Sequence, residues 1–478
     1  MKPFMTGAVV LLTFTLGLLA ETEGLHVGAA KADISPTVTP FQLRSGKSTY
    51  VHDPLHVRAL AFQNGEGRVA IAIVDAIGVG EEMCAEAKAI VQEKTGWKPE
   101  QILIAGTHTH TAPKGGDTSP GRIAYEETRR EGLATALLDA IAALQPAKVG
   151  FASDAEASEV RNRRWFLKPG EVELGPLGEP DQVRTNGPRD KLLKPAGPID
   201  PEIAVIDVRT RQGRPLGLLA NYALHYVGGL PKIREENGRE VGVASADYFG
   251  EFARLMPYRV GGSRPPEDFV AMMSNGASGD INNLTFTLTR PPRAPFEQIQ
   301  IVATKAADTA WRAIQKIDDY TESPLIATRQ RSVPLAYRKP SEDEVQRALK
   351  LLELTRKERE EINKRTSSVA TRTIEYASPE MEESQEVIIQ AIRIGDQAIV
   401  SLPFEVLVEI GLEIKERSPF PHTLLIELAN GGYGYLPTPE QHELGGYETW
   451  LGTSRFAKDS SRILTEQLLE MLEELHRL

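Results

Sequence analysis

The chain has 478 residues, a net charge of −11 and a single cysteine, Cys84. This length supplies a sizeable apolar core without cross-links, and one cysteine excludes an intramolecular disulfide or a cysteine zinc cluster. No basic block is present that would track a phosphate backbone, so we expect no nucleic-acid partner.

The N-terminus is typical of a secretory signal peptide. A cation at Lys2 precedes an apolar run from about Gly7 to Ala20, after which the chain becomes polar. The run is short for a membrane span, although an uncleaved anchoring helix is the alternative. We predict a signal peptide over residues 1–24, with cleavage at Ala20 or Gly24 left open, and a secreted or periplasmic location.

Beyond this segment, short β-type runs alternate with helical periodicity, which predicts an α/β fold with mixed β-sheets flanked by helices. We expect strands at 68–79, 102–106, 147–153, 202–209, 216–224, 268–274, 386–402 and 423–428. Helices are expected at 81–94, 124–144, 246–256, 294–317, 405–418 and 460–478.

Two stretches interrupt this alternation. Residues 168–200 are rich in Pro and Gly and predict a long loop that could cover a site. Residues 341–367 open with Ser and acidic residues and carry dense mixed charge, which predicts a solvated helical insertion.

Two histidines follow the apolar run "ILIAG", in the sequence "THTHTAP". If the run is a strand, His108 and His110 point to the same side of its C-terminal end, where α/β folds place their chemistry. An isolated pair of this kind also fits two polar loop residues. The pair alone therefore does not distinguish a functional site from an ordinary loop, and other parts of the chain are needed to do so.

Three further places carry candidate ligands. His225 ends the apolar run of "NYALHY", and Glu405 in "LPFE" follows a strand pattern and begins a predicted helix. Tyr433, Tyr435 and Tyr447 lie in the Gly-rich region that starts at "NGGYGYLPTPEQ". A hydrogen-bonded core histidine, a carboxylate at a helix N-terminus and ordinary turn residues are the alternatives.

Taken in order, "THTHTAP", "RNRRW", "NYALHY", "SADYFGEFA", "NGASGDINN", "LPFE" and "NGGYGYLPTPEQ" resemble the catalytic region of the neutral (alkaline, non-lysosomal) ceramidases. Those enzymes are secreted or membrane-associated zinc amidases that cleave the N-acyl bond of ceramide. The similarity covers about residues 25–478 and implies one catalytic domain there, without the C-terminal immunoglobulin-like domain of some members.

The resemblance implies one Zn²⁺ per chain, held by His108, His225, Glu405 and Tyr435, with Tyr433 as the alternative tyrosine. His110 would polarise the substrate carbonyl or orient the water, and Arg163 of "RNRRW" would be a further site residue. A protonated His110 or Tyr447 would return a proton to the leaving amine.

The chain departs from the family at two positions. Asn282 stands where the family carries a serine, which excludes a covalent mechanism through that position but leaves a hydrogen-bond donor for an oxyanion. Phe404 replaces the glycine of the family's "P-G-E" turn.

We therefore expect a zinc-dependent hydrolase that cleaves an amide bond of an N-acyl lipid or related small molecule by zinc-activated water, with transient contact to a membrane surface. A catalytically impaired metal- or ligand-binding homologue is the main alternative. A further alternative is a metal-dependent phosphoesterase. The sequence argues against it, because it lacks the second cluster of carboxylates or histidines that two-metal sites use. The oligomeric state is left open.

The signal peptide is directly testable. We expect the mature protein to begin between about Glu21 and His26 and to be recovered outside the cytoplasm, because the apolar run ends at small residues. N-terminal sequencing of purified protein checks this. Recovery of chains beginning at Met1 from the cytosol would contradict it.

Overall fold

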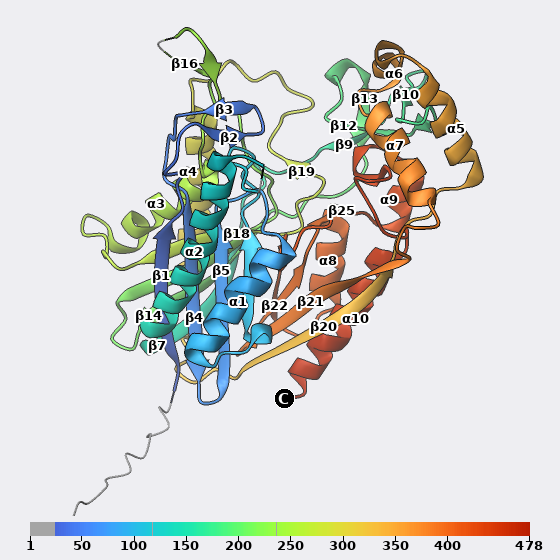
Figure 1. Ribbon diagram of the computed structural model, residues 1–478. Coiled ribbons are helices and arrows are strands. Elements are labelled where there is room, and N and C mark those ends of the chain that lie inside the picture. Colours follow the sequence, from blue (N-terminus) through green and yellow to red (C-terminus); the bar gives the residue numbers. More distant parts are fainter. Residues whose placement is uncertain (1–23, 117, 236) are drawn as a thin grey trace, which may run out of the picture.

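The structure is a computed structural model that describes residues 24–116, 118–235 and 237–478. The signal peptide predicted over residues 1–24 lies, except for its last residue, outside the described residues. Within the described ranges, no helix is long and apolar enough to cross a membrane. The molecule has four layers in the order helices, large sheet, small sheet, helices (Figure 1).

The large sheet has eight strands in the order β18-β15-β14-β7-β1-β4-β5-β6. Neighbouring strands are antiparallel except in the pairs β5–β6 and β15–β18, which are parallel. The predicted mixed sheet is thus confirmed. Its strands are β1 (His26–Asp33), β4 (His56–Asn64), β5 (Gly67–Val74), β6 (Ile102–Gly106), β7 (Gln145–Ala155), β14 (Glu202–Thr210), β15 (Pro215–Tyr222) and β18 (Val270–Asn275).

Both faces of the large sheet are covered, which explains why its central strands are almost wholly apolar. In β5, Ala70 and Ala72 contact the helical layer, whereas Ile71 and Ile73 contact the small sheet. The helical layer consists of α1 (Glu81–Thr95), α2 (Pro120–Ala142), α3 (Asp247–Gly261) and α4 (Glu297–Ile314).

The small sheet has the order β20-β21-β22-β24, with β22 and β24 parallel. The run predicted as one strand over 386–402 is a hairpin, because Gly395 adopts a left-handed φ of 61° and turns the chain. The outer face packs on two helices. These elements are β20 (Ile326–Ala336), β21 (Ser384–Ile394), β22 (Gln397–Leu402), β24 (His422–Glu427), α8 (Val408–Arg417) and α10 (Ser460–His476).

The stretch 341–367 is helical, and its helices continue to residue 377. Ser341 forms the expected capping box with Glu344. The helices are α5 (Glu342–Glu353), α6 (Arg356–Ile362) and α7 (Thr366–Ala377).

Two expectations need correction. The stretch 168–200 is not an unstructured loop, because its short strands pair within small sheets beside β9. Glu405 does not begin a helix: it lies in the short strand β23, and α8 starts at Val408.

The small strands are β2 (Phe41–Leu43), β3 (Gly46–Ser48), β8 (Arg161–Asn162), β9 (Arg164–Leu167), β10 (Glu173–Leu174), β11 (Pro180–Asp181), β12 (Val183–Thr185), β13 (Leu192–Pro195), β16 (Ile233–Arg234), β17 (Glu240–Val241), β19 (Ile281–Asn282), β23 (Glu405–Val406) and β25 (Tyr435–Leu436).

Each parallel pair of the two main sheets is joined through one α-helix, in the units β5-α1-β6, β15-α3-β18 and β22-α8-β24. Parallel strands in such units end at the same edge of the sheet. The segments that follow these strands contain the candidate ligands, so the fold itself brings them together. The remaining short elements are η1 (Pro99–Gln101), η2 (Arg189–Lys191), α9 (Pro439–Leu444) and η3 (Tyr447–Thr449).

A buried ion pair ties the C-terminal region to β9. Arg164 and Glu448 are both fully buried, and the guanidinium donates to Glu448 Oε2 at 2.8 Å. It also donates to the side chain and carbonyl of Gln441 and to the carbonyl of Gly445. Loss of one partner would leave a buried charge with too few contacts.

We therefore expect Arg164→Met to lower the free energy of unfolding by about 3–5 kcal/mol. The matched control is Arg417→Met, which removes an exposed pair with Glu466 and should cost at most about 1 kcal/mol. Urea denaturation followed by tryptophan fluorescence measures both. An equally small decrease in the free energy of unfolding for both variants would show that the Arg164–Glu448 pair does not stabilise the attachment of the C-terminal region to β9.

Candidate metal centre and active site

The candidate ligands lie directly beyond the ends of strands. His108 follows β6, His225 follows β15, and Glu405 follows β22. Tyr435 begins β25, which pairs in parallel with β23 so that Tyr435 stands opposite Glu405. Residues more than 300 positions apart in the sequence thus meet at one edge.

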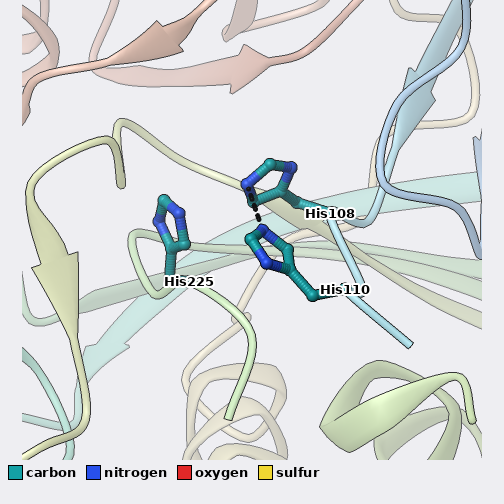
Figure 2. A group of neighbouring side chains, drawn as sticks. All are labelled: His108, His110 and His225. Atoms are coloured by element: carbon teal, nitrogen blue, oxygen red, sulfur yellow. Dashed lines mark hydrogen bonds between the residues drawn. The ribbon is translucent and has the colours of Figure 1, made fainter. Parts of the chain in front are cut away.

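The two histidines are held in the same way. Nδ1 of His108 lies 2.7 Å from the carbonyl oxygen of Ile77, and Nδ1 of His225 lies 2.7 Å from that of Ser278. A carbonyl oxygen only accepts hydrogen bonds, so each Nδ1 carries the proton. In the neutral rings each Nε2 therefore presents its lone pair to the site (Figure 2).

The carboxylate of Glu405 completes this group. Its Oε2 atom lies 3.3 Å from Nε2 of His108 and 3.3 Å from Nε2 of His225. The same oxygen is buried and has no hydrogen bond of its own. Three electron-pair donors therefore face one another, and the set of two imidazoles and a carboxylate fits a zinc ion.

The backbone at the site is conformationally unusual. His108 has a φ of 63°, and Leu428 and Asn430 have φ values of 55° and 59°. Side-chain-bearing residues rarely adopt this left-handed region, and such strain gathers at functional sites. The histidines do not continue the strand as expected: the chain turns at His108, and the ring of His110 meets that of His108 edge-on at 4.5 Å.

His110 differs from the other two histidines in its partners. Its Nδ1 lies 3.2 Å from Nη1 of Arg44, and its Nε2 lies 3.0 Å from Nε2 of His108. A guanidinium only donates, so Nδ1 accepts and the proton of the neutral ring is on Nε2. Burial, with His108, His225 and Arg44 nearby, strongly lowers the pKa of His110. This geometry favours the neutral ring as an Nε2–H donor, whereas the expected role as an acid would need the protonated ring.

Arg163 connects the cluster to the C-terminal region. Its Nη2 donates to the Tyr435 hydroxyl at 2.9 Å, Nη1 lies 3.3 Å from His225 Nε2, and Nε donates to Glu448 at 2.9 Å. Burial and the Arg163 guanidinium lower the pKa of His225 to about 4. Tyr433 instead donates to Glu81, so Tyr435 is the tyrosine that lies at the cluster.

A second buried carboxylate, Glu427, supports the cluster from behind. It accepts from the backbone N–H of Val406 at 2.7 Å and of Ser278 at 3.2 Å, and from the Ser278 hydroxyl. Burial raises its pKa to about 8, against the opposing effect of these donors and of His108. Glu427 therefore fixes both the residue after Glu405 and the carbonyl that holds His225.

Asn282 lies behind the site and does not line the pocket. Its side-chain amide donates to Asn186 at 2.7 Å and its Oδ1 accepts from the backbone of Leu284. Asn186, from the segment between β12 and β13, does line the pocket. Asn282 therefore contacts the pocket wall through Asn186, whose Oδ1 accepts its amide N–H.

The cluster opens into a cavity of about 410 Å³. Tyr447 lines it, as do several residues that sequence reasoning missed. Tyr226 stacks on His110 with a centroid distance of 3.8 Å, and its place in the motif "NYALHY" could have indicated it. Arg44 and Asn186 also line the cavity, but no sequence motif marks either residue. The lining residues are Arg44, Ile77, Gly78, Val79, Gly80, His108, His110, Arg163, Thr185, Asn186, Tyr226, Glu405, Leu428, Gly432, Gly434, Tyr435 and Tyr447.

Known proteins share this architecture. No family model matches the sequence. A crystal structure of the neutral ceramidase from Pseudomonas aeruginosa has a TM-score of 0.68 and 17% sequence identity to this chain. The match covers 95% of this chain and 75% of the ceramidase chain. A second ceramidase structure matches 95% of this chain and 76% of its own, with a TM-score of 0.69 and 15% identity. The chain thus has the neutral ceramidase fold, as its motifs predict.

The geometry of the cluster predicts metal content. Purified protein should hold about one zinc ion per chain, and His108→Ala or His225→Ala should abolish most of it because each removes an inward-facing lone pair. His422→Ala, at an exposed position, is the control and should leave zinc unchanged. Elemental analysis after dialysis gives the ratio. Full zinc occupancy in His225→Ala would exclude that residue as a ligand.

Proposed function

We propose that this chain is a secreted or periplasmic zinc-dependent hydrolase that cleaves amide bonds of N-acyl compounds. The observation that carries the proposal is the convergence of His108 Nε2, His225 Nε2 and Glu405 Oε2 within 3.3 Å contacts in a buried site. These three residues would hold the metal, with Tyr435 as the fourth candidate. When bound, zinc would acidify a water molecule toward a pKa of about 7 and polarise the substrate carbonyl.

Amide hydrolysis adds the water oxygen to the carbonyl carbon, breaks the C–N bond and delivers a proton to the leaving nitrogen. His110 would donate its Nε2–H to the carbonyl oxygen as negative charge develops there. Because burial keeps the His110 ring neutral and Arg44 occupies its Nδ1, the proton for the leaving amine would come from Tyr447, which lines the same cavity and would in turn recover the proton that the attacking water loses. Arg163 would hold Tyr435 in place.

The fold supports the substrate class that we propose. The two structural relatives are ceramidases, which supports an N-acyl lipid or a related amide as the substrate. We extend the proposal to a single catalytic domain over residues 25–478, with a charged helical insertion at 341–367 and transient contact with a membrane surface.

A panel of N-acyl amides and esters tests this function. Zinc-loaded wild type should cleave at least one member, and His110→Ala should lower kcat about 10²- to 10³-fold at unchanged zinc content, the range for one oxyanion donor. His422→Ala should behave as wild type, because it lies away from the cavity. Zinc binding without turnover across the panel would identify a binding protein instead.

A further inference from the structure

Arg44 stands at the mouth of the cavity with most of its donors unused. It lies in the turn between β2 and β3, is exposed, and lines the cavity. Its Nη1 contacts His110, but among the described residues it forms no ion pair with a carboxylate. A guanidinium carries five N–H groups, so an Arg44 that lines the cavity keeps donors beyond the one at His110.

A second arginine lies beside the same cavity. The guanidinium of Arg365, at the start of α7, is 5.8 Å from the ring centroid of Tyr447. Arg365 is exposed and likewise has no carboxylate partner within the described ranges. By contrast, Arg163 deeper in the site is ion-paired at 2.9 Å with Glu448, which it shares with Arg164. In a chain with a net charge of −11, two unneutralised arginines beside one cavity are a local excess of positive charge.

We propose that Arg44 forms an anion subsite at the cavity mouth and that the substrate is an amide bearing a carboxylate or phosphate near the scissile bond. This inference rests on the proposed hydrolase function. The simplest such substrate is an N-acyl amino acid, from which water would release a carboxylic acid and a free amino acid. Planar, bidentate contact with carboxylate or phosphate oxygens is the interaction a guanidinium makes best.

Arg44 could instead serve only to orient His110 through Nδ1. The two roles differ in what they affect. An orienting role changes the turnover of every substrate by the same factor, whereas an anion subsite changes the ratio between charged and neutral substrates. That ratio is therefore the diagnostic quantity.

Two matched pairs separate the possible anions: N-acyl glycine with N-acyl glycinamide, and N-acyl phosphoethanolamine with N-acyl ethanolamine. We expect zinc-loaded wild type to favour the anionic member of at least one pair by about 10- to 100-fold in kcat/KM, the range of one charge-assisted contact. The pair that shows the preference identifies the anion. The preference should fall as sodium chloride rises from about 0.02 to 0.5 M, because the arginine is exposed.

Arg44→Gln should bring this ratio to within about 3-fold of unity, and glutamine still offers an N–H to His110. Lys47→Gln removes the same charge from the same hairpin outside the cavity lining and should keep the preference. Cleavage of charged and neutral members at equal rates, or an unchanged ratio in Arg44→Gln, would overturn the subsite.

Failure of the hydrolase proposal looks different, since no member of either pair would then be cleaved. In that case the subsite can still be tested by measuring the affinity of the same four compounds for wild type and Arg44→Gln by calorimetric titration. Tighter binding of an anionic member that is lost in Arg44→Gln supports it. Equal affinity for anionic and neutral members contradicts it.

Discussion

Two hydrogen bonds from imidazole Nδ1–H groups to backbone carbonyls set the geometry on which the site depends. His108 follows β6 and is held by Ile77, which follows the neighbouring parallel strand β5. His225 follows β15 and is held by Ser278, which follows the neighbouring parallel strand β18. Each ring is thus oriented by the partner strand of its own strand-helix-strand unit, so the register of the sheet decides where the Nε2 atoms point.

The small sheet repeats this arrangement with a carboxylate. Glu405 follows β22, and Glu427 ends the parallel neighbour β24 and accepts the N–H of Val406. The large sheet therefore positions the two imidazoles, and the small sheet positions the candidate acidic ligand and Tyr435. The apolar contacts between the two sheets do more than stabilise the core: they keep the two halves of the candidate metal site at contact distance.

Local patterns predicted much of this architecture, because most of its strands and helices have clear periodicity of their own. A histidine directly after an apolar run marked His108 and His225, whereas Glu405 and Tyr435 needed the family resemblance, since either alone fits an ordinary turn. The prediction that a helix begins at Glu405 was wrong, because this residue pairs as part of β23 with β25, which lies 30 residues later in the sequence. Arg44 could not be found in advance, because its role depends on a hairpin docking beside His110.

The distribution of the ligands along the chain also has a consequence for biosynthesis. The imidazoles belong to residues 108 and 225, while the candidate acidic ligand is residue 405. During translation the first two emerge long before the third, and a pair of neutral rings alone supplies no compensating negative charge for a divalent cation. A metal ion held by all three residues would therefore be captured late, only after the small sheet has packed against the large one.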